Sequence, residues 1–190
     1  MELKDYIYCY PNLLDSNTNL CFHDVCQSGI LKFQEATIVR GGQKLLDKDF
    51  RSTKFCDLRP DYAESMTKNH WARYLRFKFQ ESFAKYDKDT NCTTNAQIND
   101  IQVLKYTPGD HFNFHFDDGP TTPRTLSGIY FVNDNFEGGD LIFKDPKSNE
   151  QTKIKKEKNL FIVWPSNFLY FHTVTNVTKG ERYSVVTWGR

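Results

Sequence analysis

The sequence lacks a strong excess of either charge. Lys plus Arg number 25 and Asp plus Glu number 24, so the formal net charge of the 190-residue chain is +1. A dedicated nucleic-acid-binding protein usually carries a basic excess or a clear basic face that neutralises phosphates. The near-neutral balance therefore argues against nucleic acid as a partner.

Long apolar runs are missing as well. No stretch approaches the roughly 18 apolar residues that a membrane helix needs. The first residues, MELKDYIYCYPNLLDS, lack the basic start and apolar run of a signal peptide. The five cysteines are odd in number and form no CxxC pair, which favours reduced thiols over a disulfide framework. These absences predict a cytoplasmic protein with no membrane partner.

Aromatic residues are abundant, with 16 Phe and 10 Tyr. Aromatic side chains favour pleated, half-buried surfaces, so the composition indicates β structure. The length suits one compact domain, and no segment has the composition of a linker. We expect a single domain over residues 1–190, in which 1–99 give helical and β support with a possible lid and 100–190 form the core.

The first half has mixed patterns. Residues 4–10 and 32–39 have the composition of strands, while the stretch from Gly41 to Pro60 is polar and punctuated like a long loop. Asp15 or Ser16 is suited to cap a helix running to about Gly29. A second helix is predicted from about Asp61 to Tyr86, because helical spacing brings six apolar residues largely to one side: Met66, Trp71, Tyr74, Leu75, Phe79 and Phe83.

The second half is a series of short β-rich runs separated by turn residues. This pattern is typical of a β-sandwich or jelly roll. Helices followed by strands indicate an α+β fold, mainly β, with N-terminal helices supporting one face of the core. The runs are IQVLKY, HFNFHFD, TLSGIYFVN, DLIFKD, KNLFIVWP, NFLYFHTV and ERYSVVTWG.

The segment HFNFHFDD, residues 111–118, carries the first candidate site. Side chains alternate along a strand, so His115 and Asp117 point the same way, about 7 Å apart along the chain. An imidazole nitrogen and a carboxylate oxygen on one wall can both reach one metal ion. A single HxD pattern is weak evidence, because it also occurs by chance.

His172 strengthens the metal hypothesis. It lies in the late apolar run NFLYFHTV, where the alternative interpretation is a core imidazole bonded to the backbone. Two histidines and one carboxylate form the facial triad that suits iron(II) and leaves positions open for other ligands. Ten residues later, Arg182 and Ser184 alternate onto one face of the next run. An arginine fork with a neighbouring hydroxyl suits a carboxylate, whereas the alternative for Arg182 is a surface position on an edge strand.

Four blocks of the sequence together resemble a known family. They are YTPGDHFNFHFD, RTLSGIYFVN, FEGGDLIF and FHTVTNVTKGERYSVVTW, in this order. They are similar to the blocks of the prolyl 4-hydroxylase group of iron(II)/2-oxoglutarate dioxygenases. The resemblance covers residues 100–190 and reaches faintly back through 51–58. It implies a double-stranded β-helix, which is a jelly-roll core with supporting N-terminal helices.

The resemblance also implies roles for individual residues. His115, Asp117 and His172 would bind iron(II), and Arg182 would hold the distal carboxylate of 2-oxoglutarate with help from Ser184. Tyr106 would line the co-substrate pocket, although a core aromatic is an equal alternative. The implied activity is hydroxylation of a C–H bond, most simply of a prolyl residue in a peptide or protein, using O2, releasing succinate and CO2 and depending on ascorbate to keep iron reduced.

Two departures from the family pattern stand out. Collagen-type members commonly have Lys where this chain has Arg182. Where many members have a tyrosine near the co-substrate carboxylate, this chain has Phe131, which cannot donate a hydrogen bond. We therefore expect Arg182 and Ser184 to provide more of the anchoring.

Other histidines and acids are weaker ligand candidates. His111 could line the pocket mouth, Asp118 should point away from His115 and Asp117, and His23 and His70 lie in the first half. Other functions also stay open. They are a 2-oxoglutarate oxygenase acting on another side chain or on alkylated nucleic acid, a cupin-like metal-binding module without redox activity, and a zinc hydrolase.

Overall fold

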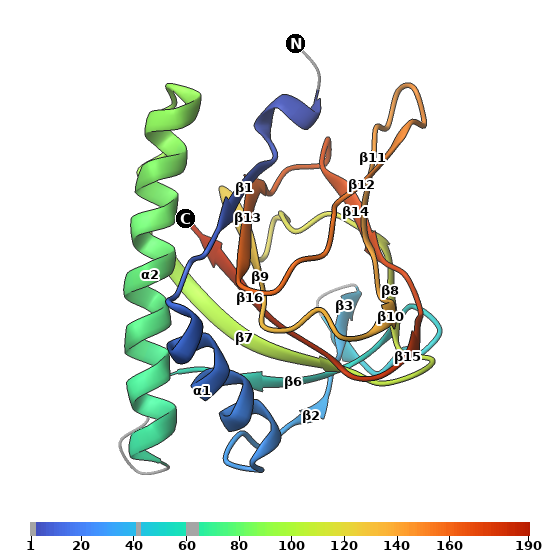
Figure 1. The fold of residues 1–190 in the computed structure, drawn as a ribbon. Helices are drawn as coiled ribbons and strands as arrows, with labels where there is room; N and C mark the ends of the chain where they lie inside the picture. Colours follow the sequence, from blue (N-terminus) through green and yellow to red (C-terminus); the bar gives the residue numbers. More distant parts are fainter. Residues whose placement is uncertain (1–2, 41–42, 60–64) are drawn as a thin grey trace.

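A computed structural model describes residues 3–40, 43–59 and 65–190 of the chain (Figure 1). The helical elements are η1 (Leu3–Tyr6), α1 (Ser16–Gln27) and α2 (Met66–Thr90). The strands are β1 (Tyr8–Pro11), β2 (Gln34–Glu35), β3 (Ile38–Arg40), β4 (Gln43–Leu45), β5 (Arg51–Ser52), β6 (Lys54–Asp57), β7 (Ile98–Tyr106), β8 (His111–His115), β9 (Leu126–Phe131), β10 (Glu137–Gly138), β11 (Leu141–Lys144), β12 (Gln151–Lys153), β13 (Leu160–Pro165), β14 (Phe171–Val174), β15 (Val177–Lys179) and β16 (Arg182–Gly189).

Two antiparallel sheets form the core. The major sheet has seven strands in the order β1-β13-β9-β16-β7-β6-β2, and the minor sheet has five in the order β12-β11-β14-β8-β5. Apolar residues of both sheets form one buried cluster, which includes Ile129 and Ile162 from the major sheet and Leu141 and Val174 from the minor sheet. The two sheets therefore pack face to face, as the predicted jelly-roll core requires.

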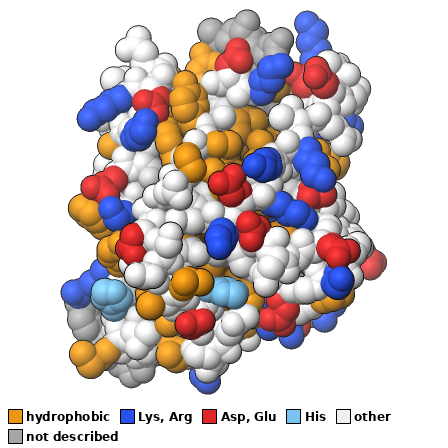
Figure 2. Space-filling view, in the orientation of Figure 1, with side chains coloured by type: hydrophobic (Ala, Val, Ile, Leu, Met, Phe, Trp, Pro, Cys, Tyr) orange, Lys and Arg blue, Asp and Glu red, His pale blue; other side chains and the backbone are white. Residues whose placement is uncertain are grey.

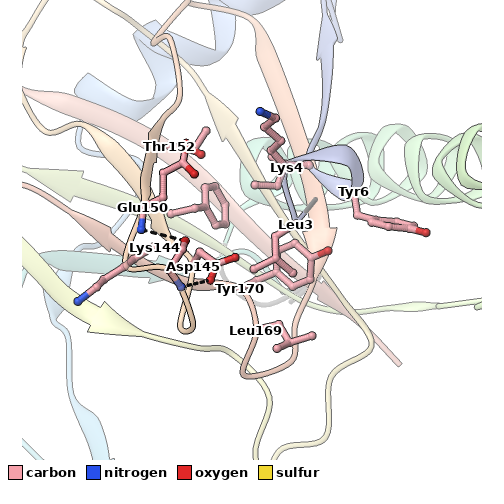
Figure 3. Close-up of a pocket in the computed structure, with 12 residues that line it drawn as sticks. Leu3, Lys4, Tyr6, Lys144, Asp145, Glu150, Thr152, Leu169 and Tyr170 are labelled. Atoms are coloured by element: carbon pink, nitrogen blue, oxygen red, sulfur yellow. Dashed lines mark hydrogen bonds between the residues drawn. The ribbon is translucent and has the colours of Figure 1, made fainter. Parts of the chain in front are cut away.

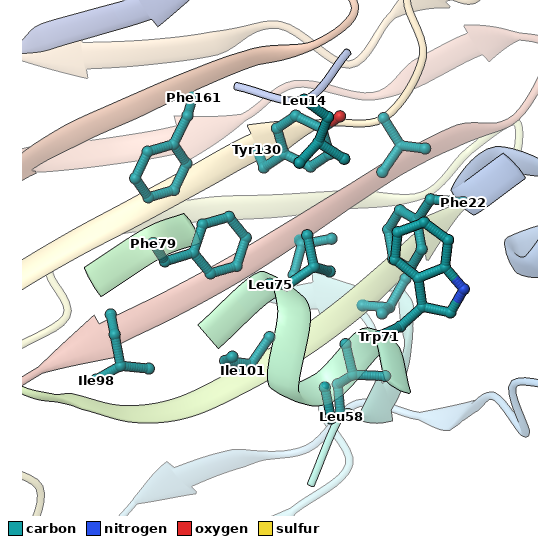
Figure 4. Packing of buried hydrophobic residues seen from close by; sticks show 14 of the residues in the cluster. Leu14, Phe22, Leu58, Trp71, Leu75, Phe79, Ile98, Ile101, Tyr130 and Phe161 are labelled. Carbon is teal, nitrogen blue, oxygen red and sulfur yellow. The ribbon is translucent and has the colours of Figure 1, made fainter. Parts of the chain in front are cut away.

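The other face of the major sheet is covered by the two helices (Figure 1). A second buried cluster joins Trp71, Leu75 and Phe79 of α2 to outward-facing strand residues such as Tyr130 and Phe161 (Figure 4). The Phe79 and Phe161 rings stack with centroids 4.7 Å apart. The major sheet is consequently buried on both faces, which explains the continuous burial of β9.

Local sequence signals set the helix ends. Asp15 caps α1 by accepting a hydrogen bond from the Thr18 backbone N–H, and Ser65 accepts one from the Lys68 N–H at the start of α2. Helix α2 ends at Asn91, whose positive φ of 53° gives the left-handed conformation common at helix C-termini. The predicted first helix is confirmed. The predicted start of the second near Asp61 lies outside the described residues.

Several predictions for the first half are wrong. The stretch predicted as a loop contains β4, β5 and β6, while its proposed ends Gly41 and Pro60 lie outside the described residues. The predicted strand at 4–10 begins as a 3-10 helix, and the one at 32–39 is two short strands, β2 and β3. Met66 was expected on the buried side of α2 but is 91% exposed. These short strands gain their stability from neighbouring chains, so their own sequences give little signal.

The surface carries both charges interspersed. On the face shown in Figure 2, acidic and basic side chains alternate and neither sign dominates. In the described part of the chain, no helix is long and apolar enough to cross a membrane.

The stacked Phe79 gives a test of the helix-to-sheet packing. Phe79→Ala should lower the free energy of unfolding by about 3–5 kcal/mol, because it leaves a cavity against Phe161. Phe77→Ala is the matched control, since Phe77 lies on the same helix and is 58% exposed; its change should stay within about 0.5 kcal/mol. Urea denaturation measures both. Equal losses in the two variants would contradict this packing.

Candidate metal centre

Pairing of β14 with β8 in the minor sheet brings two histidines together. His172 is the direct cross-strand partner of His115, and their ring centroids lie 4.3 Å apart. Each ring has an aromatic neighbour: Phe112 stacks on His115 at 3.6 Å, and Trp164 meets His172 edge-on at 5.2 Å. These contacts fix both imidazoles in the space between the sheets.

Asp117 follows directly after β8 and completes the group. Its Oδ1 lies 3.8 Å from His115 Nε2, and its Oδ2 lies 3.7 Å from His172 Nε2. One potential ligand atom from each of the three residues lies within 4.8 Å of the others. Tetrahedral or octahedral metal ions can bind such a set with small side-chain adjustments, because ligand distances near 2 Å place neighbouring donors about 3 Å apart.

Backbone hydrogen bonds orient both histidines. His115 Nδ1 lies 2.8 Å from the Asn113 carbonyl, and His172 Nδ1 lies 2.9 Å from the Tyr170 carbonyl. A carbonyl oxygen only accepts, so each Nδ1 donates and each Nε2 keeps its lone pair toward Asp117. This arrangement is common in metal sites, where the second ring nitrogen fixes the orientation of the ligand.

Two serines hold Asp117 in place, one through its carboxylate and the other through its backbone. Ser127 Oγ donates to Asp117 Oδ2 at 2.7 Å and contacts Ser166 Oγ at 2.7 Å. The Ser166 carbonyl accepts hydrogen bonds from the backbone N–H groups of Asp117 and Asp118. Asp117 is therefore tied to β9 and to the end of β13, although it lies outside a strand itself.

Burial controls the protonation of the group. It lowers the pKa of His115 to about 3, with His172 adding to the shift and Asp117 opposing it. Burial alone would raise the pKa of Asp117, but His172, His115, Arg124 and the hydrogen bond from Ser127 together outweigh it, and the pKa is lowered. Near neutral pH the site therefore presents a neutral imidazole and a carboxylate, which are the forms that bind a metal.

Arg182 lies deep in the major sheet. Its strand, β16, is bordered by β9 and β7, so it is central and the edge-strand alternative is wrong. The side chain is 0% exposed, and Nη1 donates to Ser184 Oγ at 2.9 Å. The guanidinium carbon lies 4.8 Å from the Tyr106 ring centroid and 5.1 Å from that of Phe131. Among the residues that the structure describes, Nε and Nη2 find no hydrogen-bond partner.

An unsatisfied buried guanidinium is costly unless an anion joins it. Burial lowers the pKa of Arg182, but an arginine remains protonated at any physiological pH. The two free nitrogens suit a carboxylate, as expected for Arg182 with Ser184. Phe131, at the position of the missing tyrosine, packs on the cation and offers no donor.

One cavity of about 820 Å³ contains the metal-binding group. Its walls include His115, Asp117 and His172 together with Tyr106, over whose ring Arg182 lies. A second hollow of about 450 Å³ lies between η1, the β11–β12 hairpin and the loop before β14 (Figure 3). The described residues that line it include no histidine or cysteine, and the group of three potential ligands lies in the larger cavity.

The other candidates are not members of the metal-binding group. His111 was a possible residue of the pocket mouth but does not line the cavity; its Nε2 lies 3.0 Å from the Asp49 carbonyl. Asp118 lines the cavity beside Asp117 and accepts a hydrogen bond from the Arg124 backbone N–H. His23 packs against Tyr183, and His70 stacks on Tyr74.

Four residues around the cavity were not predicted from the sequence to have a role in the site. Ser127 and Ser166 support Asp117, as described above. Arg124 lines the cavity with its Nη1 donating to the Asp117 carbonyl, and its guanidinium carbon lies 3.8 Å from the Trp188 ring centroid. Arg51 reaches the cavity from β5, within the stretch predicted as a loop. Only the alternation of β9 could have suggested Ser127, since it places that residue on the same face as Ile129.

The fold and the site together define a class: a double-stranded β-helix with two histidines and one carboxylate that could hold a metal ion, and a buried arginine. Comparison with known proteins gives a family resemblance for the second half of the chain. Residues 101–190 match the family model of the 2OG-Fe(II) oxygenase superfamily. The family is named for iron(II) and 2-oxoglutarate, which the residues present here fit.

Individual relatives and solved structures are also similar to this chain. A PKHD-type hydroxylase of Parvibaculum lavamentivorans is 34% identical over 94 residues, covering 47% of this chain and 41% of the relative. The matched segment thus spans about two fifths of that relative's length.

Two solved structures share the fold. The first is a Trichoplax adhaerens prolyl hydroxylase in complex with a hypoxia inducible factor oxygen degradation domain peptide fragment. It has a TM-score of 0.74 at 20% identity, covering 96% of this chain and 82% of that one. A Pseudomonas putida prolyl-4-hydroxylase has a TM-score of 0.66 at 14% identity, covering 97% and 91% of the two chains. At these identities the likeness establishes the double-stranded β-helix fold alone.

Ser127 gives a test of the metal site. Ser127→Ala should weaken binding of iron(II) about 10- to 100-fold, because Asp117 loses the hydrogen bond that orients it. Anaerobic calorimetry measures the affinity. Ser127→Thr keeps the hydroxyl and is the matched control, expected to bind within about threefold of the native protein. Unchanged affinity in the alanine variant would show that Asp117 does not depend on this contact.

The low pKa of His115 predicts a pH dependence for the metal-free protein. Between about 3 and 6.5 the unfolded chain binds the proton that folded His115 rejects, so stability rises with pH across this range. This contribution is complete above pH 6.5 and is lost as the pH falls toward 3, at up to about 1.4 kcal/mol per pH unit.

Urea denaturation of chelator-treated protein from pH 4.5 to 7 measures this slope. His115→Asn should flatten it, whereas His111→Asn, which removes a histidine from the same strand, should not. Parallel slopes for the native protein and the His115 variant would refute the burial effect.

Proposed function

We propose that this chain is an iron(II)- and 2-oxoglutarate-dependent dioxygenase that hydroxylates a C–H bond of a prolyl residue in a peptide or protein, releasing succinate and CO2. One observation carries the proposal: three potential ligands, His115, Asp117 and His172, share a cavity with Tyr106. Arg182 lies over the Tyr106 ring, and two of its nitrogens are unpaired within the described residues. A plain metal-binding module or a zinc hydrolase has no need of that buried arginine.

His115, Asp117 and His172 would hold the iron. Three protein ligands leave room for a bidentate oxo acid and for dioxygen. When bound, iron and 2-oxoglutarate together supply the oxidising power that inserts an oxygen atom into an unactivated C–H bond. The protein's part is binding, orientation and exclusion of water.

Arg182 and Ser184 would bind the distal carboxylate of the co-substrate. The guanidinium already shares Nη1 with Ser184, so Nε and Nη2 are left for the anion. Tyr106 lies on the neighbouring strand directly opposite Arg182 and lines the cavity. With Phe131 in place of a tyrosine, Arg182 provides the charge-assisted hydrogen bonds that fix this end.

The rim of the cavity suits a peptide. Ile38 and Lys44, from the strands of the β3–β4 hairpin, line it, and so does the 46% exposed Phe116. We infer that this hairpin covers a bound substrate and keeps water from the iron. The aromatic walls are appropriate for an apolar ring such as that of proline.

The named functions of relatives support the substrate class. PKHD-type hydroxylases match the second half of the chain, and one structural neighbour was solved with a peptide bound. We therefore propose a proline-containing peptide or protein as the partner. Ascorbate is the proposed reductant that keeps the iron in its active state.

The proposal is tested first by binding and then by turnover. Anaerobic addition of iron(II) and 2-oxoglutarate should give the weak visible charge-transfer band of the chelate. In air with ascorbate, proline-containing peptides should gain the mass of one oxygen, with one succinate formed for each hydroxylation. A folded protein without the band would overturn the oxygenase assignment.

Variants separate the roles. His172→Ala should remove the band and reduce succinate production to background. Arg182→Lys should keep iron binding but raise the 2-oxoglutarate concentration needed for half-maximal band at least about tenfold, because a bidentate fork is lost. Circular dichroism checks that each variant is folded. Succinate without any hydroxylated peptide would retain the oxygenase chemistry and reject the prolyl substrate.

A further inference from the structure

Arg51 is one of three arginines that line the cavity, and the proposed function gives it no role. It lies on β5, the short edge strand of the minor sheet, directly opposite Phe112 on β8. Its guanidinium carbon is 4.6 Å from the Phe112 ring centroid, and the same ring stacks on His115 at 3.6 Å. One aromatic ring therefore separates this cation from a proposed iron ligand.

The position of Arg51 is fixed by the fold. The Arg51 backbone N–H donates to the Asp47 carbonyl at 2.9 Å. The next residue, Ser52, donates from its hydroxyl to Asp110, whose other carboxylate oxygen accepts from the Thr107 backbone N–H and hydroxyl. The turn before β8 thus anchors β5, and the guanidinium is held at the cavity wall.

The Arg51 guanidinium makes no hydrogen bond or ion pair within the described part of the chain, and its Nε is buried without a partner. The other two arginines of the cavity do have partners. Arg59 lies 3.8 Å from Asp57 and 3.7 Å from Asp100, and Arg124 bonds to the Asp117 carbonyl. Arg51 is the exception among them, because its charge is left uncompensated.

Bound iron and 2-oxoglutarate would not neutralise the positive charge of Arg51 either. The formal charges of iron(II), the Asp117 carboxylate, the 2-oxoglutarate dianion and Arg182 sum to zero. Burial lowers the pKa of Arg51 while Tyr106 and Asp117 oppose the shift, so the cation persists in this setting. A half-buried guanidinium with free donors is stabilised by a carboxylate, which it binds through two parallel hydrogen bonds.

We propose that Arg51 is a substrate-binding residue that selects a peptide with an acidic side chain close to the residue that is oxidised. The inference rests on the proposed function, since it takes a peptide as the occupant of the cavity. Successive residues of an extended peptide are about 3.3–3.6 Å apart, so the acidic side chain belongs within about three residues of the target proline. Lys44, exposed on β4, also lines the cavity and adds a second positive charge that favours an acidic peptide.

The test uses matched peptides with a central proline. Each carries one Glu at a position from −3 to +3, and each has a partner with Gln there. Fluorescence anisotropy measures their binding to the protein loaded with manganese(II) and 2-oxoglutarate under nitrogen, so no turnover is needed. At one position the Glu peptide should bind at least about tenfold tighter than its Gln partner, as expected for a charge-assisted hydrogen bond.

Variants assign that preference to Arg51. Arg51→Gln should abolish the preference for Glu, and Arg51→Glu should reverse it in favour of a Lys peptide at the same position. Arg59→Gln is the matched control, because Arg59 is another cavity arginine but has acidic partners; it should keep the preference. Equal binding of Glu and Gln peptides, no binding by any peptide, or a Glu preference that survives Arg51→Gln would each overturn the proposal.

Two further outcomes distinguish a failure of this inference from a failure of the proposed function. Loss of the iron–2-oxoglutarate charge-transfer band in Arg51→Gln would assign the carboxylate to the co-substrate and overturn the inference. A Glu preference that depends on Arg51, without hydroxylation of any proline, would keep Arg51 as the acidic-residue contact and reject the prolyl substrate instead.

Discussion

The pairing of β14 with β8 is the contact on which the site depends. It sets His172 directly opposite His115 and brings both into the space between the two sheets. Because side chains alternate along a strand, a shift of one residue in this register would turn one histidine out of the cavity. The backbone carbonyls of Asn113 and Tyr170 then fix the ring orientations, so the sheet determines both the position and the tautomer of each imidazole.

Buried charge is the second constraint on this structure. Arg182 is fully enclosed, and within the described part of the chain its Nε and Nη2 have no hydrogen-bond partner. A protein gains no stability from leaving two such nitrogens unpaired, because desolvation of a charge is expensive. An anion that accepts hydrogen bonds from these nitrogens would offset this cost, which is the physical reason for proposing a carboxylate as their partner.

The two faces of the major sheet have different roles. Its outer face packs on the helices through residues such as Phe161, and its inner face carries Tyr106, Phe131 and Arg182. Alternation along β16 makes this division possible, since Arg182 and Ser184 face inward while Tyr183 and Val185 join the helix-side core. Changes to the helix side are therefore expected to act on folding more than on the metal centre.

Much of the site could be predicted from local sequence. The RxS spacing brings Ser184 to Arg182, because it depends only on the two-residue period of a strand. The HxD spacing correctly grouped His115 with Asp117, although Asp117 lies beyond the end of β8. Helix α1 was predicted from its Asp15 cap, and the strands of the second half from their apolar runs. In each case the determining interaction lies within a few residues of chain.

Tertiary structure decided the rest. That His172 faces His115, that Ser127 holds Asp117, and that Arg182 lies in a central strand all follow from pairings between segments far apart in the chain. The strands β5 and β6 were missed because strands of two to four residues become stable only through the sheets they join. The sequence by itself determined which residues could bind a metal and an anion. Only strand pairing across the fold decided that His115, Asp117 and His172 share one cavity with Tyr106 and Arg51.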